Sequence, residues 1–207
     1  MIVTFLLTRK YRYVIRLMFG FFKKYSEVNM KINCKKSELF FLKGEIGNKK
    51  AKEFCEWLKE LFDTTPNVYI ILSVNGGNTE ATTDIVEMIN SYPGKTTCIA
   101  SGKCRSAGID ILLSCDTRLA NISCRFLVHR SKKIIKIKMS RNKDIKNHLK
   151  EIEMVRRELR IHDRATIAYI VNKTKLKTIQ AARLLKKGQE FSAVEALEFG
   201  FINNITN

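Results

Sequence analysis

Acidic side chains and long apolar runs are both scarce in this chain of 207 residues. Asp and Glu number 20 against 38 Lys and Arg, which leaves a formal net charge of +18. No uninterrupted apolar stretch approaches the ~18–20 residues that a membrane-spanning helix needs. A composition of 45% hydrophobic and 28% charged residues excludes both a membrane channel and a disordered chain. The length suffices for one globular domain, or for one domain with an appendage.

Closely spaced cysteines and a nucleotide-binding loop are also missing. The chain has six cysteines, Cys34, Cys55, Cys98, Cys104, Cys115 and Cys124. No two of them form a CxxC motif, and several lie in apolar runs, where cysteine behaves as a small hydrophobe. We therefore expect reduced thiols, no metal ion, no cofactor and a cytoplasmic location. No G-x-x-x-x-G-K-[ST] motif occurs, so any ATP would be bound by a partner.

The positive charge is unevenly distributed along the chain. Residues 1–50 carry a net +9 and residues 130–160 a net +8, whereas residues 51–129 carry a net −2. A nucleic-acid-binding protein usually places its basic groups on the element that binds. Because the basic residues flank a near-neutral block, we expect no nucleic-acid partner and assign the charge to surface, assembly or localisation.

The first 29 residues are a basic extension with interleaved aromatic residues. Their apolar run precedes the basic residues and lacks a small-residue cleavage site, unlike a secretory signal. Two interpretations are open. The extension is either an amphipathic arm that contacts a membrane surface or a partner, or a poorly ordered or mis-assigned start ahead of Met30. We accordingly divide the chain into an extension, 1–29, and a domain, 30–207.

The middle of the chain alternates strand and helix signals. The pattern predicts strands at 38–46, 68–74, 96–100, 117–120 and 124–129, and helices at 49–62, 79–92 and 107–115. The run at 68–74 is almost continuously apolar, as in a strand buried on both faces. Glycine turns are predicted at 75–78 and 101–106. This order implies parallel strands, right-handed crossovers and an α/β fold with ligands at the carboxyl ends of the strands.

The last third of the chain is predicted to be mainly helical. Apolar residues step by three and four positions along 142–172, which predicts a long amphipathic helix with a basic outer face. A shorter helix, 178–187, is expected to end at Gly188. Ser192 and Glu195 form a capping box that opens a final helix, which Gly200 closes before a terminal strand at 201–205.

Three local features could carry chemistry. Ser106 lies at a predicted strand-to-helix turn, where small neighbours can expose a hydroxyl above the sheet and the helix start favours negative charge. The paired Gly76 and Gly77 can point backbone N–H groups at a ligand, as an oxyanion requires. His129, one of only three histidines, ends an apolar strand.

Each of these features also has an ordinary structural explanation. A serine at a helix start is usually an N-cap, and paired glycines often make simple turns. A histidine at a strand end is more often a surface or core residue than a base. Together the features are stronger evidence for a catalytic site, because His129 follows the helix that begins after Ser106 and can fold back beside it.

In this order the features resemble the proteolytic subunit of the Clp protease (ClpP), a serine peptidase family of crotonase-like fold. The resemblance covers residues 38–205 and rests on five segments: Leu39-Phe-Phe-Leu-Lys-Gly44, Asn75-Gly76-Gly77, Gly102 to Gly108, Leu127-Val128-His129 and Phe191-Ser-Ala-Val-Glu-Ala-Leu-Glu-Phe-Gly200. It implies repeated β-α-β units with a mainly parallel sheet. It also implies a protruding "handle" helix within residues 130–175.

Carried over residue by residue, the resemblance makes Ser106 the nucleophile and His129 the general base that takes the hydroxyl proton. The N–H groups of Gly77 and Ala107 would form the oxyanion hole. The resemblance also implies polypeptide substrates, a homo-oligomeric ring (a heptamer or a stacked double ring) and an AAA+ unfoldase as partner.

Two positions depart from the family pattern. Asn75 stands where the family has proline, a change that the turn tolerates. The family's third triad member is an aspartate four residues before the closing Ser-Ala, and that position is Gly188 here. Glu190 is the candidate orienting acid if the segment contains a two-residue insertion. A backbone carbonyl, or no orienting group at all, are the alternatives, and Asp110 is a weaker candidate.

The sequence thus predicts a serine endopeptidase of the ClpP type that hydrolyses unfolded proteins inside a ring. One alternative is a catalytically impaired ring subunit that lacks the triad acid. Another is a phage-type or membrane-associated relative that acts without an ATPase. A crotonase-like acyl-CoA enzyme would also use a glycine-turn oxyanion hole, but it does not explain a Ser106–His129 pair.

Overall fold

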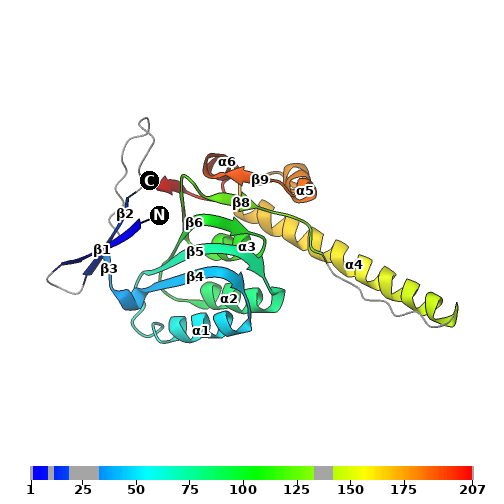
Figure 1. Cartoon of the computed structure of the whole chain (residues 1–207), viewed down its shortest axis with the longest axis horizontal. Helices are drawn as coiled ribbons and strands as arrows, with labels where there is room; N and C mark the ends of the chain where they lie inside the picture. Colours follow the sequence, from blue (N-terminus) through cyan, green and yellow to red (C-terminus); the bar gives the residue numbers. More distant parts are fainter. Residues whose placement is uncertain (1, 9–11, 19–32, 133–141, 207) are drawn as a thin grey trace. The chain divides into compact units, whose positions relative to one another are not determined.

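The chain folds into two compact units, which are described separately. The computed structural model describes residues 2–8, 12–18, 33–132 and 142–206. One unit consists of Met1–Leu127 and Glu190–Asn207, and the other of Val128–Gln189 (Figure 1). The division between an extension, 1–29, and a domain stays a prediction, because residues 19–29 lie outside the described part of the chain.

The first unit is built on a parallel sheet. Its main strands are β4 (Leu39–Ile46), β5 (Val68–Gly77), β6 (Thr96–Arg105), β7 (Thr117–Asn121) and β10 (Asn204–Thr206), in the order β10-β7-β6-β5-β4. All four neighbouring pairs are parallel. The predicted α/β class with mainly parallel strands is therefore confirmed.

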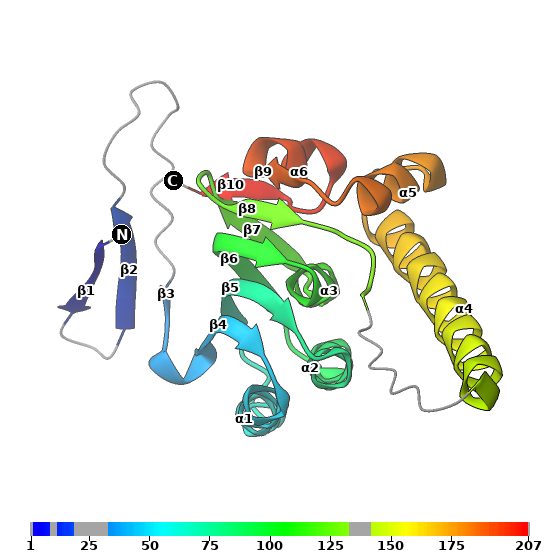
Figure 2. The ribbon, with the colours of Figure 1, turned by 45° about the vertical axis from the view of Figure 1, so that its right-hand side comes forward.

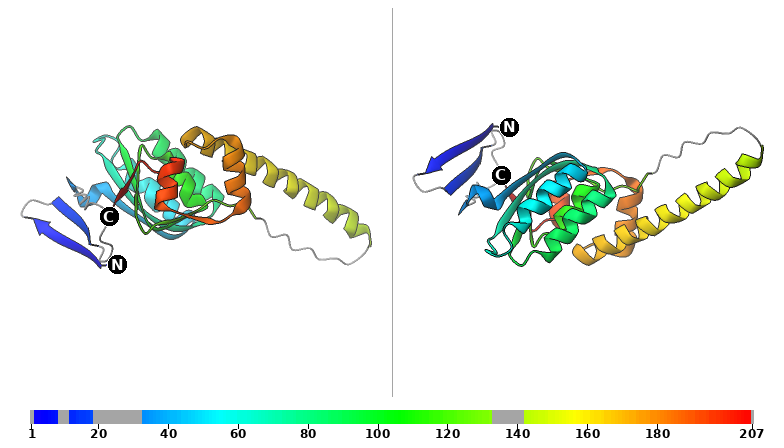
Figure 3. Two further views of the ribbon diagram at one scale, coloured as in Figure 1. Left: turned by 90° about the horizontal axis from the view of Figure 1, so that it is seen from above. Right: turned by 90° about the horizontal axis from the view of Figure 1, so that it is seen from below.

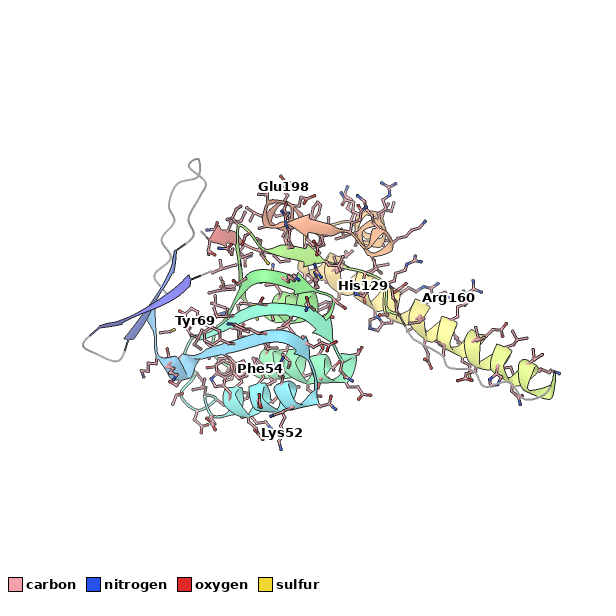
Figure 4. The ribbon with its side chains drawn as sticks, in the orientation of Figure 1. Lys52, Phe54, Tyr69, His129, Arg160 and Glu198 are labelled. Atoms are coloured by element: carbon pink, nitrogen blue, oxygen red, sulfur yellow. The ribbon has the colours of Figure 1, made fainter. Side chains whose placement is uncertain are left out.

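A single layer of helices covers one side of this sheet. The helices α1 (Asn48–Lys59), α2 (Thr79–Ser91) and α3 (Ala107–Ser114) follow β4, β5 and β6, and lie next to one another (Figures 2 and 3). Phe54 of α1 is completely buried and points toward the sheet, where its ring meets that of Phe40 edge-on at 5.2 Å (Figure 4). Burying such a side chain contributes about 1.5–3 kcal/mol, so this layer holds the sheet in place.

Strand β5 differs from the prediction in two ways. Ile70 and Leu72 are completely buried, whereas Tyr69 and Ile71 are only partly buried on the opposite face. The strand thus has one fully buried face, not two. It also continues to Gly77, where a turn from residue 75 was predicted.

Strand β6 likewise continues through its predicted glycine turn. Gly102 has a φ of +83°, and the pairing of β5 with β6 shifts between Leu72 and Val74. The first half of β6 pairs with β7, and Lys103–Arg105 pair in parallel with β8 (Arg125–Leu127). Glycine lets the chain form a bulge here and resume pairing, so the strand reaches Arg105 and delivers Ser106 at its end.

A short strand that the pattern did not predict completes the sheet. Strand β9 (Glu190–Ser192) pairs antiparallel with β8, and α6 (Ala193–Phe199) follows it. The predicted capping box is confirmed: the Ser192 hydroxyl accepts from the Glu195 N–H at 3.2 Å, and the Glu195 carboxylate accepts from the Ser192 N–H at 2.7 Å. Gly200, with a φ of +85°, ends the helix as expected.

The N-terminal strands form a separate small sheet. Strands β1 (Ile2–Thr8) and β2 (Arg12–Met18) are antiparallel, and β2 also pairs with β3 (Asn33–Cys34). A 3-10 turn, Lys36–Glu38, then leads into β4. Among the described residues, no helix combines the length and the apolar character needed to cross a membrane.

The second unit is dominated by one long helix. Helix α4 (Asn142–Lys173) has 32 residues and is followed by α5 (Thr178–Lys187), which packs against it (Figure 1). Gly188 ends α5 in the left-handed conformation, with a φ of +58°. Both helices and this glycine cap lie where the sequence predicted them.

Candidate active site

Ser106 occupies a sharp junction between β6 and α3. Its φ of +51° and ψ of −121° are unusual, and Thr65 is the one other described non-glycine residue with a positive φ. Such a backbone costs on the order of 1–3 kcal/mol and is common at active sites. The Ser106 side chain makes no capping hydrogen bond to α3. An ordinary N-cap therefore does not explain this serine, which is half-buried at the junction between strand and helix.

Backbone contacts hold Ser106 on both sides. Its N–H donates to the Leu127 carbonyl of β8 at 2.8 Å, and its carbonyl accepts from the Ile109 N–H at 2.8 Å. Gly108 lets α3 lie close to β5, because a Cβ there would be 2.3 Å from Cγ2 of Val74. The N-terminus of α3 is thereby fixed at Ser106, where its partial positive charge favours a developing anion.

The end of β5 lies directly against Ser106. A Cβ on Gly76 would be 2.9 Å from the Ser106 Cβ and 3.4 Å from its Oγ, and Gly76 has a φ of +115°. At Gly77 a Cβ would be 2.1 Å from the Ile46 carbonyl oxygen. Gly76 thus brings bare backbone to the Ser106 hydroxyl, whereas Gly77 lies against the backbone of β4. The assignment of the hole to the N–H groups of Gly77 and Ala107 stays a prediction.

His129 lies two residues beyond the end of β8, not within the strand as predicted. Its ring nitrogen Nδ1 is 2.7 Å from the carbonyl oxygen of Arg130 (His129 is labelled in Figure 4). A carbonyl only accepts hydrogen bonds, so Nδ1 carries a proton, and in the neutral form of the ring the lone pair is on Nε2. A backbone carbonyl is one of the orienting groups considered above, and its role, like that of His129 as general base, stays a prediction.

The segment that carries His129 is tied to α4. Arg130 Nε lies 3.4 Å from Asp163 Oδ2, and the Ser131 hydroxyl lies 3.0 Å from Nδ1 of His162. Asp163 and His162 are neighbours on the helix. The carbonyl that orients His129 therefore belongs to a residue whose side chain is itself anchored.

Gly188 faces His129 within the second unit. A Cβ on Gly188 would lie 3.6 Å from the Cβ of His129. In the ClpP pattern this position holds the orienting aspartate, and the structure brings it to His129 without any insertion. The carboxylate of Glu190 is hydrogen-bonded to the guanidinium of Arg105 in the first unit. Glu190 as orienting acid stays a prediction, as does the pairing of Ser106 with His129, which lie in different units.

Asp110 is the other acid considered above. It lies on α3, one turn after Ser106, and burial raises the pKa of its carboxyl to about 6. In the part of the chain that the structure describes, no group of three or more His, Cys, Asp or Glu side chains is arranged to hold a metal ion. All six cysteines are free thiols, and all but Cys55 are buried.

Comparison with known proteins identifies the family. The family model for Clp protease matches residues 24–207. The chain belongs to the Clp protease family. A relative, the ATP-dependent Clp protease proteolytic subunit 2 of Treponema pallidum (strain Nichols), is 26% identical over 191 residues, which is 89% of this chain and 85% of the relative.

Solved structures of ClpP proteins share the fold. A point mutant of ClpP1 from Listeria monocytogenes superposes with a TM-score of 0.70 at 23% identity. ClpP1 from the same organism gives a TM-score of 0.68 at 20% identity, and each alignment covers 83% of this chain and 92% of the other. The chain is therefore a protease of the Clp family, serine-type by family, with the ClpP fold and a long helix that fits the handle.

Two features of the site were not predicted. The contact of Gly76 with Ser106 depends on the bulge in β6, and only the paired glycines hinted at it. The bond between Arg105 and Glu190 joins residues 85 positions apart. Opposite charge alone does not predict such a pair. The pair depends on β9, and the sequence pattern did not predict that strand.

Proposed function

We propose that this Clp-family chain is a serine endopeptidase in which Ser106 is the nucleophile and His129 the general base. The observation that carries the proposal is the conformation of Ser106, strained at a strand-helix junction with its side chain free of capping and with Gly76 against it. His129 follows Leu127 by two residues, and the Leu127 carbonyl accepts a hydrogen bond from the Ser106 N–H. His129 thus follows closely in sequence the residue that accepts the hydrogen bond of Ser106.

In the proposed reaction, Nε2 of His129 takes the Ser106 hydroxyl proton while Oγ attacks the carbonyl carbon of a peptide bond. The resulting oxyanion is stabilised by the N–H groups of Gly77 and Ala107. His129 then gives the proton to the leaving amine, and the C–N bond breaks to leave an acyl-enzyme. Water, deprotonated by His129, hydrolyses the ester and restores Ser106.

In this proposal the Arg130 carbonyl orients the ring of His129 in place of an acid at position 188. Replacing the acid of a serine-protease triad with an amide favours the wrong histidine tautomer and costs about 10⁴ in kcat. The carbonyl favours the correct tautomer but carries no full negative charge to stabilise the imidazolium. We therefore expect an active enzyme that is slower than one with a carboxylate at this position.

We also propose that the chain works as a homo-oligomeric ring in the cytoplasm, fed with unfolded polypeptides by an AAA+ unfoldase. Helix α4 leaves the apolar side chains of Ile145, Leu149 and Ile152 39%, 57% and 39% exposed along one stripe. An exposed apolar stripe on a long helix indicates a protein contact. The name of the Treponema pallidum relative, an ATP-dependent proteolytic subunit, supports the same arrangement.

Hydrolysis of an unfolded protein tests this function. Purified chain is incubated with denatured, fluorescently labelled casein, and release of labelled peptides is followed, with Ser106→Ala as control. The proposal predicts hydrolysis by the wild type alone. Equal hydrolysis by Ser106→Ala would assign the activity to a contaminant and overturn it.

Gly188 favours a second candidate function, that of a catalytically impaired subunit in a mixed ring with an active relative. This candidate predicts no hydrolysis by the chain alone and co-migration with the relative in gel filtration. Independent migration of the two proteins would exclude it.

A further inference from the structure

Beside the proposed nucleophile, an ion pair joins the two outer strands of three neighbouring strands. Arg105 is the last residue of β6 and Glu190 the first of β9, and Nη2 of the former is bonded to Oε1 of the latter. Strand β8 runs between them, so the pair spans two strand spacings, about 10 Å of backbone separation. The two side chains are only 28% and 40% exposed. Water therefore screens this pair less than a fully exposed one.

The pair lies in one row with the backbone contact of the nucleophile. Leu127 is the register partner of Arg105 in β6 and of Glu190 in β9. The carbonyl of Leu127 accepts from the Ser106 N–H at 2.8 Å. Arg105, Leu127 and Glu190 thus fix one another at the residue that holds Ser106.

Both connections to the second unit leave from this row. That unit runs from Val128 to Gln189, so it begins immediately after Leu127 and ends immediately before Glu190. His129 is two residues from one end and Gly188 two residues from the other. The ion pair therefore clamps the two points at which the chain leaves and re-enters the first unit. His129, the proposed base, follows the first point, and Gly188 precedes the second.

We propose that Arg105 and Glu190 are positioning residues for the reaction, which hold Leu127, the last residue before the segment that carries His129, in register with the strand that ends at Arg105. The inference rests on the proposed function. In this role neither side chain needs to touch the reacting atoms, because the pair acts by fixing Leu127, from which the His129 segment extends. A misplacement of about 1 Å at a reacting group can cost 10²-fold in rate, so even a small shift of Leu127 is expected to be measurable.

The guanidinium also depends on Glu190 for its hydrogen bonding. The Nε atom of Arg105 is buried and has no hydrogen-bond partner among the described residues. Removing the carboxylate would leave a half-buried cation with fewer partners, which is costly enough to displace it. Loss of Glu190 should therefore move Arg105 and the backbone that precedes Ser106.

If Glu190 had a different role, removing Arg105 would have the opposite effect on the rate. If Glu190 itself oriented His129, removing Arg105 would release the carboxylate for that task and leave the rate equal or higher. If the pair is a clamp, Arg105→Met and Glu190→Gln should be equally harmful. The double variant should then be no worse than either single one, because both remove the same interaction.

The test measures the rate at which a fluorophosphonate forms a bond from phosphorus to Ser106 Oγ with loss of fluoride. Full-length wild type is compared with Glu190→Gln, Arg105→Met and the double variant. Glu56→Gln, which breaks the exposed Lys52–Glu56 pair, serves as control. We expect a rate about tenfold lower in all three site variants and unchanged in the control. The final extent of labelling should equal that of the wild type, because a loss of folded protein would lower the extent instead.

Several results would overturn the clamp. Wild-type labelling rates in Glu190→Gln, a rate in Arg105→Met that is equal to or above the wild type, or a double variant about a hundredfold slower would each contradict it. Reduced final labelling at an unchanged rate would assign the pair to stability alone. If the wild type itself formed no Ser106 adduct, the proposed function would fail first, and the two failures are thereby distinguished.

Discussion

A Cβ atom on Gly188 would lie 3.6 Å from the Cβ of His129. The ring of His129 meanwhile donates through Nδ1 to the carbonyl of Arg130 at 2.7 Å. The position from which an acid could reach the imidazole is thus occupied by a residue without a side chain. A main-chain oxygen accepts the hydrogen bond of the ring instead.

Restoring a carboxylate at this position should accelerate the chemistry. We expect Gly188→Asp to label with a fluorophosphonate about tenfold faster than the wild type, because a negative charge stabilises the imidazolium that forms. Gly188 has a φ of +58°, which aspartate tolerates at a cost of about 1 kcal/mol. Gly188→Asn is the matched control, with the same shape and no charge. Equal rates in both variants would show that charge at position 188 does not act on the reaction.

The close approach of Gly76 to Ser106 predicts a severe effect of one methyl group. In Gly76→Ala the new Cβ would lie 2.9 Å from the Ser106 Cβ on a backbone with a φ of +115°. We expect a loss of about 1–3 kcal/mol in the free energy of unfolding and little or no labelling of Ser106. Gly47→Ala is the control, because no atom lies within 4 Å of the Cβ built there. Denaturant unfolding and labelling that match the wild type would refute the contact.

Burial of Asp110 predicts a dependence of stability on pH. Since its folded-state pKa is raised to about 6 from 3.8, the folded state binds more protons than the unfolded state between these values. The contribution of Asp110 to the free energy of unfolding therefore falls as pH rises from about 4 to 6, by up to about 3 kcal/mol. Asp110→Asn should remove this fall. Urea unfolding from pH 4 to 7 measures it, and identical slopes in both proteins would contradict the prediction.

The apolar stripe on α4 predicts an assembly defect without a folding defect. Leu149 is 57% exposed in the single chain, so Leu149→Glu should change the free energy of unfolding by no more than about 0.5 kcal/mol. If the stripe mediates assembly, native mass spectrometry should show smaller oligomers. Asn147→Glu adds the same charge at another exposed position of α4 and should leave the oligomer intact. Loss of assembly in both variants would point to charge instead of the stripe.

The parts of the fold that follow from local pattern were predictable from the sequence. Periodicity placed α4, and the capping signals placed Gly188 and Gly200 at the ends of their helices. The paired glycines and Ser106 could be singled out from their positions at predicted strand-to-helix turns, and the family resemblance then implied a role for each.

Features that depend on pairing between distant segments were not predictable. The sequence around Gly102 predicts a turn, and only pairing with both β7 and β8 shows that it is a bulge inside β6. Strand β9 has three residues and exists because β8 is available as a partner. The hydrogen bond from His129 to a main-chain carbonyl leaves no signature in side-chain identity, so several alternatives for the orienting group remained open.

The most direct test of the Ser106–His129 assignment is intact-mass and peptide-mapping analysis after fluorophosphonate treatment of the wild type, Ser106→Ala and His129→Ala. We predict one adduct per chain, located on Ser106. We also predict no adduct in Ser106→Ala, and labelling at least 10²-fold slower in His129→Ala because the general base is gone. An adduct that persists in Ser106→Ala, or wild-type labelling rates in His129→Ala, would contradict the assignment.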